Sequence, residues 1–454
     1  MTDKKISDEQ LVINFDEPVN KKSNILEAVC KLIVDCEHKT APTQQIGYPS
    51  IRTPNIGKGK LILDGVNRVS EETYKTWTKR TTPQADDLIL AREAPIGNVA
   101  IIPKNLKVCL GQRTVLIRPD KTKVNPNYLC YLLLGDGIQN KFISVSNGST
   151  VHHLNVKDIR NLELPEIPPL PTQQKIASIL SAYDDLIENN TKRIKILEEM
   201  AQTLYREWFV NFRFPSFEQV QMVESELGLI PQGWETPQIQ ELIERGVLEK
   251  NQDGNHGEKH PKSNDYVPSG VPFIMAKDLS DNILDLKNCN FLSPEQAKSL
   301  RIGFAKAGDV LITHKATMGR VAIVPNINNF IVLTPQVTYF RVANTDLISN
   351  SFLYCTFTSE RFQDILLTQS EQSTRKFISI TNQRNIRILY PKTEIIKSFT
   401  EFVEPILNQK QSLYYKNSIL RQTRDLLLPK LISGEIDVES LDIDTKPVTE
   451  AIAA

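Results

Sequence analysis

The chain has 454 residues, more than one hydrophobic core usually organises, so about two or three domains are expected. It is 40% hydrophobic and 24% charged, without an apolar run long enough to cross a bilayer or an apolar signal core at its start, which favours a cytoplasmic protein over a membrane or exported one. The 54 basic and 54 acidic side chains cancel, so any binding to nucleic acid must come from charge gathered on one face or from a partner.

The cysteines carry no metal or disulfide pattern. Six of them are scattered along the chain without a CxxC pair. Such spacing is typical of reduced thiols and not of zinc ligands. The sequence therefore predicts no metal in this chain.

The first part of the chain, residues 24–168, is predicted to form a mixed, mostly β domain, preceded by an N-terminal segment at residues 1–23. Short β-branched runs at 99–102 and 114–117 are separated by glycine, proline and asparagine, which interrupt strands. Asn125-Pro126-Asn127-Tyr128 differs by one residue from the Asn-Pro-Pro-Tyr signature of adenine methyltransferases. We interpret it as a turn before a helix, because no GxGxxG cofactor loop accompanies it.

A long helix is predicted in the next region, residues 169–215. Pro168 to Pro171 form a stiff entry, Thr172 is the expected N-cap, and no further proline or glycine occurs before Pro215. Apolar residues alternate at steps of four and three, which is typical of a heptad seam. The seam comprises Ile176, Leu180, Tyr183, Ile187, Asn190, Ile194, Leu197, Ala201, Leu204 and Trp208.

Asn190 is the polar member of this seam. A buried amide there can fix the register or pairing of two helices at a cost in stability. It can equally be tolerated at a loose contact, and the sequence leaves both interpretations open.

The following region, residues 216–391, repeats the first domain. Gly47-Tyr-Pro-Ser-Ile51 returns as Gly270-Val-Pro-Phe-Ile274, and Gly97-Asn-Val-Ala-Ile-Ile-Pro103 returns as Gly319-Arg-Val-Ala-Ile-Val-Pro325. The offset is about 222 residues, which indicates an internal duplication. A second mostly β domain is therefore expected.

A second long helix is predicted in residues 392–438, spanning about 394–428, with a flexible tail at 439–454. Its stripe contains Phe399, Val403, Ile406, Leu413, Leu420 and Leu427, and it is interrupted by Lys410, Asn417 and Arg424. Its place in the repeat makes it the expected antiparallel partner of the first helix. The predicted fold class is α+β, with two similar domains joined by two long antiparallel spacer helices in a pseudo-two-fold arrangement.

This architecture suits a target that itself repeats along a line, and DNA is the commonest such target. A helix of about 40 residues spans roughly 60 Å, against about 34 Å for one turn of B-DNA. Because the two copies share scaffold residues but differ in their loops, each would read a different half-site. We therefore expect a bipartite, asymmetric DNA site.

Three motifs make the expectation specific. They are Leu204-Tyr-Arg-Glu-Trp-Phe-Val-Asn-Phe212 at the end of the first helix, Gly228-Leu-Ile-Pro-Gln-Gly-Trp234 at the start of the second domain, and Arg424-Asp-Leu-Leu-Leu-Pro-Lys-Leu-Ile-Ser-Gly-Glu435 at the end of the second helix. In this order they resemble the specificity subunits of type I restriction-modification systems, over residues 24–438. The first domain departs from the pattern at its start, where no Gly-Trp opening is found near Ser23, so its edge is not fixed.

The resemblance implies a non-catalytic DNA-recognition subunit. Such a subunit docks two methyltransferase subunits, which methylate adenine from S-adenosylmethionine, and can add two restriction and translocase subunits that use ATP and Mg²⁺. It implies that the chain itself binds double-stranded DNA and no cofactor. The alternatives are a fused adenine methyltransferase and a coiled-coil scaffold that binds only protein.

Candidate DNA contacts are the basic and polar residues that flank the repeated strands, where they could reach phosphates or base edges. For each of them, a plain solvated side chain is the alternative. The candidates are Lys58, Lys60, Arg92, Arg113, Thr150 and His152 in the first copy, and Lys277, His314, Lys315, Arg320, Arg375 and Lys376 in the second.

Two acid–histidine pairs recur in the copies, Asp35 with His38 and Asp253 with His256. Two residues do not make a metal site. A structural or DNA-facing loop is therefore the favoured interpretation of each pair.

Overall fold

The computed structural model describes residues 24–443 except for 147–152, 258–259, 316 and 372–376. The predicted N-terminal segment and most of the predicted tail lie outside the described residues. The chain divides into two compact units, one formed by Met1–Ile187 with Ile419–Ala454 and the other by Glu188–Ser418. Both boundaries fall inside long helices, so each unit combines a β domain with part of each helix, and the spacer regions are not separate bodies.

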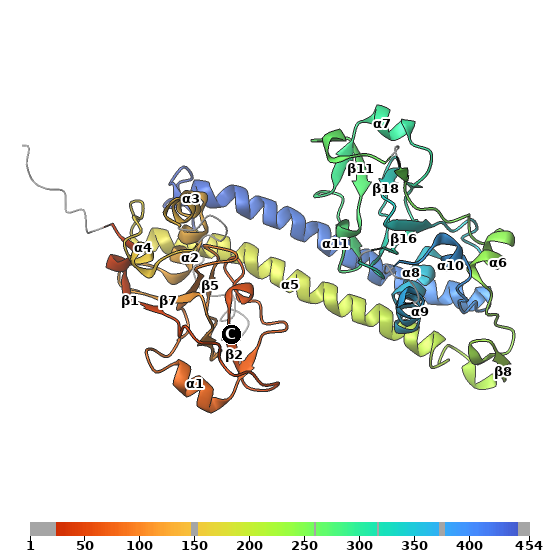
Figure 1. Ribbon diagram of the computed structural model, residues 1–454, viewed down its shortest axis with the longest axis horizontal. Coiled ribbons are helices and arrows are strands. Elements are labelled where there is room, and N and C mark those ends of the chain that lie inside the picture. Colours follow the sequence, from red (N-terminus) through yellow and green to blue (C-terminus); the bar gives the residue numbers. More distant parts are fainter. Residues whose placement is uncertain (1–23, 147–152, 258–259, 316, 372–376, 444–454) are drawn as a thin grey trace, which may run out of the picture. The chain divides into compact units, whose positions relative to one another are not determined.

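Unit 1 is built on a four-stranded antiparallel sheet of order β1-β7-β4-β5. These strands are β1 (Cys30–Asp35), β7 (Thr114–Pro119), β4 (Leu88–Ala91) and β5 (Val99–Ile101). A smaller sheet holds β3 (Arg68–Val69), β2 (Tyr48–Ile51) and β6 (Cys109–Leu110). The helices are α1 (Glu71–Trp77), α2 (Pro126–Leu134), α3 (Asp136–Val145) and α4 (Val156–Arg160), with 3-10 turns at Leu26–Val29 and Thr53–Asn55. Figure 1 shows these elements in red through orange to gold.

Unit 2 repeats the central sheet as β17-β16-β19, formed by Val321–Ile323, Val310–Thr313 and Val337–Phe340. A five-stranded sheet has the order β10 (Tyr266–Val267), β14 (Asn290–Leu292), β11 (Val271–Ile274), β18 (Ile331–Leu333) and β15 (Phe304–Ala305). Two hairpins pair β12 (Leu279–Ser280) with β13 (Ile283–Leu284) and β8 (Met222–Ser225) with β9 (Gly228–Pro231). The helices are α6 (Ile239–Glu244), α7 (Pro294–Ser299), α8 (Asn350–Thr358), α9 (Glu360–Glu371) and α10 (Ile380–Arg384), with 3-10 turns at Phe217–Gln219, Ser263–Asp265 and Ala276–Asp278.

The duplication seen in the sequence extends to buried ion pairs. In unit 1, Arg118 Nε donates to Asp87 Oδ1 at 2.8 Å, and in unit 2 Arg341 Nε donates to Asp309 Oδ1 at 2.8 Å. Both aspartates are 2% exposed, and a second guanidinium nitrogen of each arginine bonds the other carboxylate oxygen. Such a bidentate bond fixes both partners in orientation.

The glycine that follows β4 in unit 1 and β16 in unit 2 recurs for a conformational reason. Gly97 and Gly319 both have a φ of 81°, a left-handed conformation that favours glycine. An added Cβ would lie 2.7 Å from Gln139 Oε1 in unit 1 and 2.1 Å from Gln363 Oε1 in unit 2. Each glutamine amide also donates to the carbonyl of its glycine at 2.9 Å. The same glutamine–glycine contact thus closes the same turn in both units.

The Asn-Pro-Asn-Tyr stretch begins a helix, which confirms its interpretation as a turn before a helix. Asn125 caps α2 by accepting a hydrogen bond from the Tyr128 backbone N–H at 3.1 Å, and Pro126 occupies the first helical position. Proline is tolerated there because the N–H of that position has no partner within the helix.

The two long helices are α5 (Leu170–Phe209) and α11 (Thr393–Ile432), each of 40 residues. The length predicted for the first helix is confirmed, but the prediction that Thr172 caps it is wrong. The helix begins at Leu170, and the Thr172 hydroxyl donates instead to Glu439 at 3.2 Å. Pro171 fits inside the first turn because the backbone N–H groups there need no helical acceptor.

The predicted end of the second helix was also wrong. α11 continues past Leu428 through Pro429 to Ile432. Leu431, on the added turn, is 2% exposed and packs in the core of unit 1 with Ile176 and Leu180. Burial of this leucine offsets the hydrogen bond that Pro429 cannot make.

Every predicted seam residue of the two helices is buried or half-buried. Ile176, Leu180, Ile187, Asn190, Leu197 and Leu413 are at most 9% exposed. Tyr183, Ile194, Leu204, Leu420 and Leu427 are half-buried. Within unit 2, Asn190 bonds Asn417, and Glu198 pairs with Lys410, so the helices run antiparallel there.

The sequence motifs at the start of the second domain and the end of the first helix meet in one aromatic cluster of unit 2. Phe209 lies 5.8 Å from the Trp234 ring centroid and 4.9 Å from that of Phe399. Phe214 is 4.9 Å from Trp234. Edge and tilted ring contacts stabilise the fold beyond the effect of the area that the rings bury. These motifs therefore join α5, α11 and the β domain.

All six cysteines are free thiols, and five are buried. Burial raises the pKa of Cys30 and of Cys130 to about 12. Within the described part of the chain, no helix combines the length and apolar character needed to cross a membrane.

Candidate nucleic-acid interface

In unit 1, one edge of the central sheet collects charged side chains. Strands β1 and β4 both run antiparallel to β7, so their carboxyl ends lie beside the amino end of β7. Asp35 ends β1, Arg92 and Glu93 follow β4, and Arg113 precedes β7. The sheet topology therefore brings these four residues together.

Arg92 is the buried centre of this edge. It is 7% exposed, its Nη1 donates to both oxygens of Asp35 at 2.9 and 3.0 Å, and its Nε donates to the Leu154 carbonyl at 2.8 Å. Its Nη2 lies 2.7 Å from His153 Nε2. Because the guanidinium is enclosed by these partners, its burial argues against the prediction that Arg92 contacts DNA.

A chain of polar contacts leads from Arg92 to the surface. His153 Nε2 accepts from Arg92, which leaves Nδ1–H to donate to Glu93 Oε1 at 2.7 Å. Glu93 Oε2 also pairs with Arg113 at 3.1 Å. Arg113 is 61% exposed, so it presents a positive charge to solvent at this edge.

Unit 2 repeats the backbone frame of this edge. The N–H of Arg92 donates to the Arg113 carbonyl at 2.9 Å, and the N–H of His314 donates to the Gln336 carbonyl at 3.0 Å. The carbonyls of Arg92 and His314 each accept a backbone N–H at 3.1 Å, from Leu154 and Ile378 respectively. His314, Lys315 and Gln336 thus stand where unit 1 has Arg92, Glu93 and Arg113.

The side chains on this frame differ in chemistry between the units. His314 is 5% exposed and its Nδ1–H donates to the Ile378 carbonyl at 2.9 Å. Its Nε2 has no hydrogen-bond partner among the described residues and lies 3.8 Å from Asp253 Oδ2. Burial lowers the pKa of His314, so the ring is neutral at physiological pH. The neighbouring Lys315 is an exposed cation of this edge.

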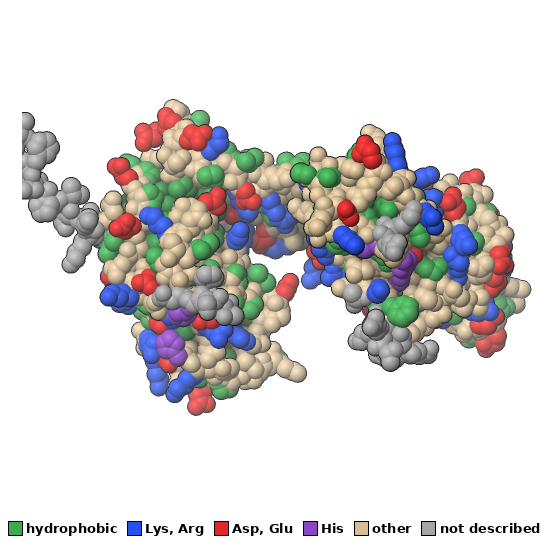
Figure 2. Space-filling view, turned by 45° about the horizontal axis from the view of Figure 1, so that its top comes forward, with side chains coloured by type: hydrophobic (Ala, Val, Ile, Leu, Met, Phe, Trp, Pro, Cys, Tyr) green, Lys and Arg blue, Asp and Glu red, His purple; other side chains and the backbone are tan. Residues whose placement is uncertain are grey.

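The recurring acid–histidine pairs belong to the same edges. His38 Nε2 lies 3.1 Å from Asp35 Oδ2, and His256 Nε2 lies 2.8 Å from Asp253 Oδ2. Both histidines are more than half exposed. Across the described ranges, no three His, Cys, Asp or Glu residues group closely enough to hold a metal ion. On the face seen in Figure 2, each unit has histidines beside lysine and arginine side chains.

The other predicted contacts are placed in several ways. Lys58 and Lys277 are exposed. Lys60 Nζ donates to the Asp184 carbonyl at 3.3 Å and to Asp185 at 3.2 Å on α5. Arg320 Nη1 donates to the carbonyls of Ala276 and Leu279, at 3.2 and 2.9 Å. Thr150, His152, Arg375 and Lys376 lie outside the described residues.

The structure therefore joins Arg92, Arg113 and His153 at one edge, and His314 with Lys315 at the other, while Lys60 and Arg320 make contacts within the protein. Sequence reasoning missed Glu93 and Gln336. Aligning the two copies residue by residue would have found them, because they occupy the positions of Lys315 and Arg113 with altered charge.

Comparison with known proteins agrees with the repeat. The model of the type I restriction modification DNA specificity domain matches residues 29–199 and again 231–414. The chain is 29% identical over 398 residues to the type I restriction enzyme MjaIX specificity subunit of Methanocaldococcus jannaschii, covering 84% of each chain. It is 24% identical over 452 residues to the HindI specificity subunit of Haemophilus influenzae, covering 86% of this chain and 95% of that one.

A solved structure shares the fold. The S subunit of a type I restriction-modification system from M. genitalium aligns with a TM-score of 0.57 and 14% identity, over 90% of this chain and 94% of that chain. This likeness confirms the α+β, two-domain architecture. The chain belongs to the type I restriction-modification specificity family, as a specificity subunit, the non-catalytic DNA-recognition component of such a system.

Proposed function

We propose that the chain binds a bipartite, asymmetric site on double-stranded DNA, with unit 1 reading one half-site and unit 2 the other. The observation that carries this proposal is the repeated sheet edge. Its backbone hydrogen bonds are the same in both units, but it presents Arg113 with Glu93 in unit 1 and Lys315 with Gln336 in unit 2. A shared frame with different polar groups would face two different sequences.

In this proposal the exposed cations contact the DNA, and the buried groups hold them in place. Arg113 and Lys58 in unit 1, with Lys315 and Lys277 in unit 2, are solvent-accessible. Arg92 and His314 are buried and support the edge from within. Local charge of this kind reconciles DNA binding with a formal net charge of zero.

The proposal includes partner subunits. The chain would dock two methyltransferase subunits through α5 and α11, and two restriction and translocase subunits would join them. S-adenosylmethionine, ATP and Mg²⁺ would be used by those partners and not by this chain. The names of the relatives support this, since each is a specificity subunit of a type I restriction enzyme. With DNA as its target, the chain would work in the cytoplasm.

The test exchanges the groups that differ between the edges. Arg113→Gln gives unit 1 the residue that unit 2 has, and Lys315→Glu gives unit 2 the residue that unit 1 has. Binding of the assembled methyltransferase is measured on duplexes in which only one half-site has been randomised. Arg113→Gln is expected to reduce discrimination at the unit 1 half-site about tenfold and to leave the other unchanged.

Lys315→Glu is expected to have the mirror effect. The control is an exposed lysine away from both edges, Lys121→Gln, which lies just past the carboxyl end of β7, whereas Arg113 precedes its amino end, and whose Nζ pairs with Asp86. Equal loss at both half-sites from either edge variant would contradict the division of labour.

A further inference from the structure

A buried ion pair joins the β domain of unit 2 to both long helices. Lys410 of α11 is 3% exposed, and its Nζ donates to Glu198 of α5, to the Tyr354 hydroxyl of α8 at 2.8 Å and to the Asn282 carbonyl at 3.2 Å. The Tyr354 hydroxyl donates to both Glu198 oxygens at 3.0 Å, and the Asn282 amide donates to Glu198 at 3.1 Å. An ammonium has three protons, and here all three have acceptors.

Unit 1 contains the matching cluster with different charged groups. Asp184 of α5 accepts from the Tyr131 hydroxyl of α2 at 2.6 Å and from Arg424 of α11. Lys60 Nζ donates to the Asp184 carbonyl at 3.3 Å. In the repeat, Tyr131 corresponds to Tyr354 and Lys60 to Asn282. Each cluster therefore ties one domain helix and one domain loop to both long helices.

These clusters account for the interruptions in the apolar stripe of α11. Lys410, Asn417 and Arg424 follow one another at intervals of seven residues. Lys410 meets Glu198 and Arg424 meets Asp184. Between them, the Asn190 amide donates to Asn417 at 3.0 Å and the Asn417 amide donates to Thr191 at 3.1 Å. Each polar residue of the stripe thus has a polar partner on α5.

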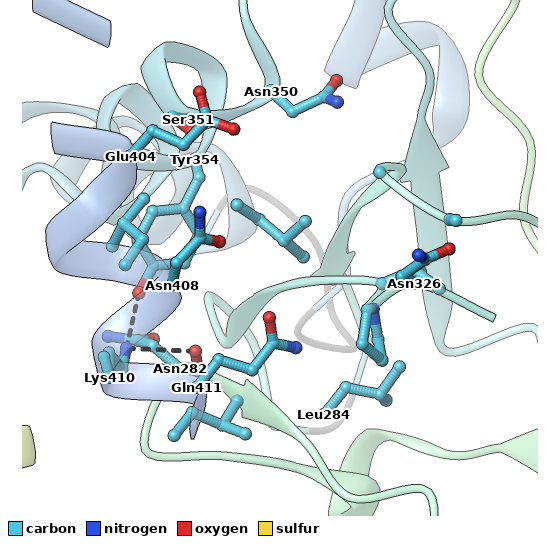
Figure 3. A pocket seen from close by; sticks show the side chains of 17 residues that line it. Asn282, Leu284, Asn326, Asn350, Ser351, Tyr354, Glu404, Asn408, Lys410 and Gln411 are labelled. Atoms are coloured by element: carbon cyan, nitrogen blue, oxygen red, sulfur yellow. Dashed lines mark hydrogen bonds between the residues drawn. The ribbon is translucent and has the colours of Figure 1, made fainter. Parts of the chain in front are cut away.

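In unit 2, α11 and the β domain are incompletely packed beside the cluster. A pocket of about 260 Å³ lies between α11 and the β domain directly beside the cluster. In Figure 3, Asn326, Asn350, Glu404 and Gln411 surround it, and the contacts of Lys410 form one end of it. Beside this pocket, the contacts of Lys410 link α11 to Tyr354 and Asn282 of the β domain.

Stability alone does not explain buried charges at these positions. Well-packed apolar residues commonly stabilise a protein as much as a buried ion pair does, whereas an ion pair accepts only a partner of matching geometry. A Tyr–carboxylate–cation cluster therefore selects one orientation of the domain. Burial, with the nearby Glu198 carboxylate, holds the pKa of Tyr354 well above its usual value, so its hydroxyl stays a donor at neutral pH.

We propose that Tyr131, Asp184 and Arg424 in unit 1, and Tyr354, Glu198 and Lys410 in unit 2, are positioning residues that set the gap between the two half-sites. They do so by fixing each recognition domain on its helix segments, without touching DNA. This inference rests on the proposed function, because it assumes that each unit reads one half-site.

The test separates gap length from half-site sequence. Tyr131→Phe and Tyr354→Phe remove only the hydroxyl at the centre of each cluster. Tyr128→Phe is the matched control, because Tyr128 lies on the same helix as Tyr131 and its buried hydroxyl has no partner among the described residues. Methylation rates of the assembled methyltransferase are measured on duplexes with the native gap, with gaps one base pair longer or shorter, and with a changed half-site.

Each cluster variant is expected to lower the preference for the native gap about tenfold, the usual effect of losing one hydrogen bond to a charged group. Discrimination against changed half-sites should be unchanged, and Tyr128→Phe should keep both preferences. The variant Glu198→Leu/Tyr354→Phe/Lys410→Met removes both charges and the tyrosine hydroxyl, so no unpaired charge is left and the protein is expected to fold. It should relax the gap further while its melting temperature stays close to that of the unaltered protein.

A folded triple variant that keeps the native gap preference would overturn the inference. The inference would also fail if the preference for the native gap were lost merely because the protein is less stable. Val332→Ala, in the five-stranded sheet and away from both helices, lowers stability alone and provides this comparison. If the unaltered protein itself shows no gapped site, the proposed function fails and the positioning role fails with it.

Discussion

At the scale of single residues, the two sheet edges show what a sequence can and cannot reveal. The repeat located Arg92, Arg113, His314 and Lys315 because they flank strands that recur. The burial of Arg92 could not be predicted, since it depends on Asp35, which is 57 residues away in sequence and beside Arg92 in the sheet. The charge of Arg92 made it a candidate DNA contact, whereas the folded protein buries its guanidinium and bonds it to Asp35.

The structural role of Arg92 predicts a large loss of stability on truncation. Arg92→Ala leaves Asp35 without the guanidinium that bonds both of its oxygens and is expected to lower the free energy of unfolding by about 3 kcal/mol. Arg113→Ala removes an exposed pair and should cost no more than about 0.5 kcal/mol. Urea unfolding of both variants measures the difference. Equal effects would show that Arg92 is not the buried centre of the edge.

His314 predicts a pH dependence of stability. Its pKa is lowered in the folded protein by burial, so the unfolded chain binds a proton more readily. The free energy of unfolding should therefore fall as the pH drops below about 6.5, the ordinary pKa of histidine. Asp253 raises this pKa, whereas His256 and Lys315 lower it, without reversing the shift.

His314→Asn is the variant that isolates this contribution, because its amide can replace Nδ1–H as donor to the Ile378 carbonyl. It should reduce the loss of stability between neutral and mildly acidic pH, as measured by urea unfolding at each pH. A pH dependence identical to that of the unaltered protein would assign the effect to another group.

At the scale of elements, periodicity located both long helices, whereas their ends depended on tertiary contacts. The heptad steps predicted α5 to within a few residues. Threonine is a residue type common at helix N-caps, but the Thr172 hydroxyl donates to Glu439, which is 267 residues away in sequence. Proline commonly follows the end of a helix, but α11 continues past Pro429, and the added turn buries Leu431. The partners of Lys410, Asn417 and Arg424 were likewise invisible until the two helices were paired.

The paired polar positions predict how the helices can be lengthened. Seven residues inserted into α5 between Thr191 and Glu198, together with seven inserted into α11 between Lys410 and Asn417, preserve every polar partner. The added helix is about 10 Å long, which corresponds to about three base pairs at 3.4 Å each. The recognised gap should grow by that amount while both half-sites remain.

An insertion into α5 alone is the control for this experiment. It shifts one helix against the other, separates the polar partners and should greatly weaken binding. Methylation mapping of both variants gives the gap directly. New half-sites in the doubly lengthened protein would contradict the assignment of recognition to the β domains.

At the scale of the whole molecule, the internal repeat was the most informative feature of the sequence. It predicted two similar domains and two helices, and the family model likewise matches the chain twice, at residues 29–199 and 231–414. The division of each helix between the two units was not predictable, because it depends on which side chains each domain packs against. Some of the basic and acidic side chains that cancel in the net charge of zero form buried ion pairs within each unit.

The most direct test of the central claim is a genome-wide map of N6-methyladenine. Cells expressing this chain with its cognate methyltransferase subunit are compared with cells that lack only this chain. A gapped, two-part motif that disappears when the chain is absent is the expected result. Methylation that persists unchanged without the chain, or a motif without a gap, would contradict it.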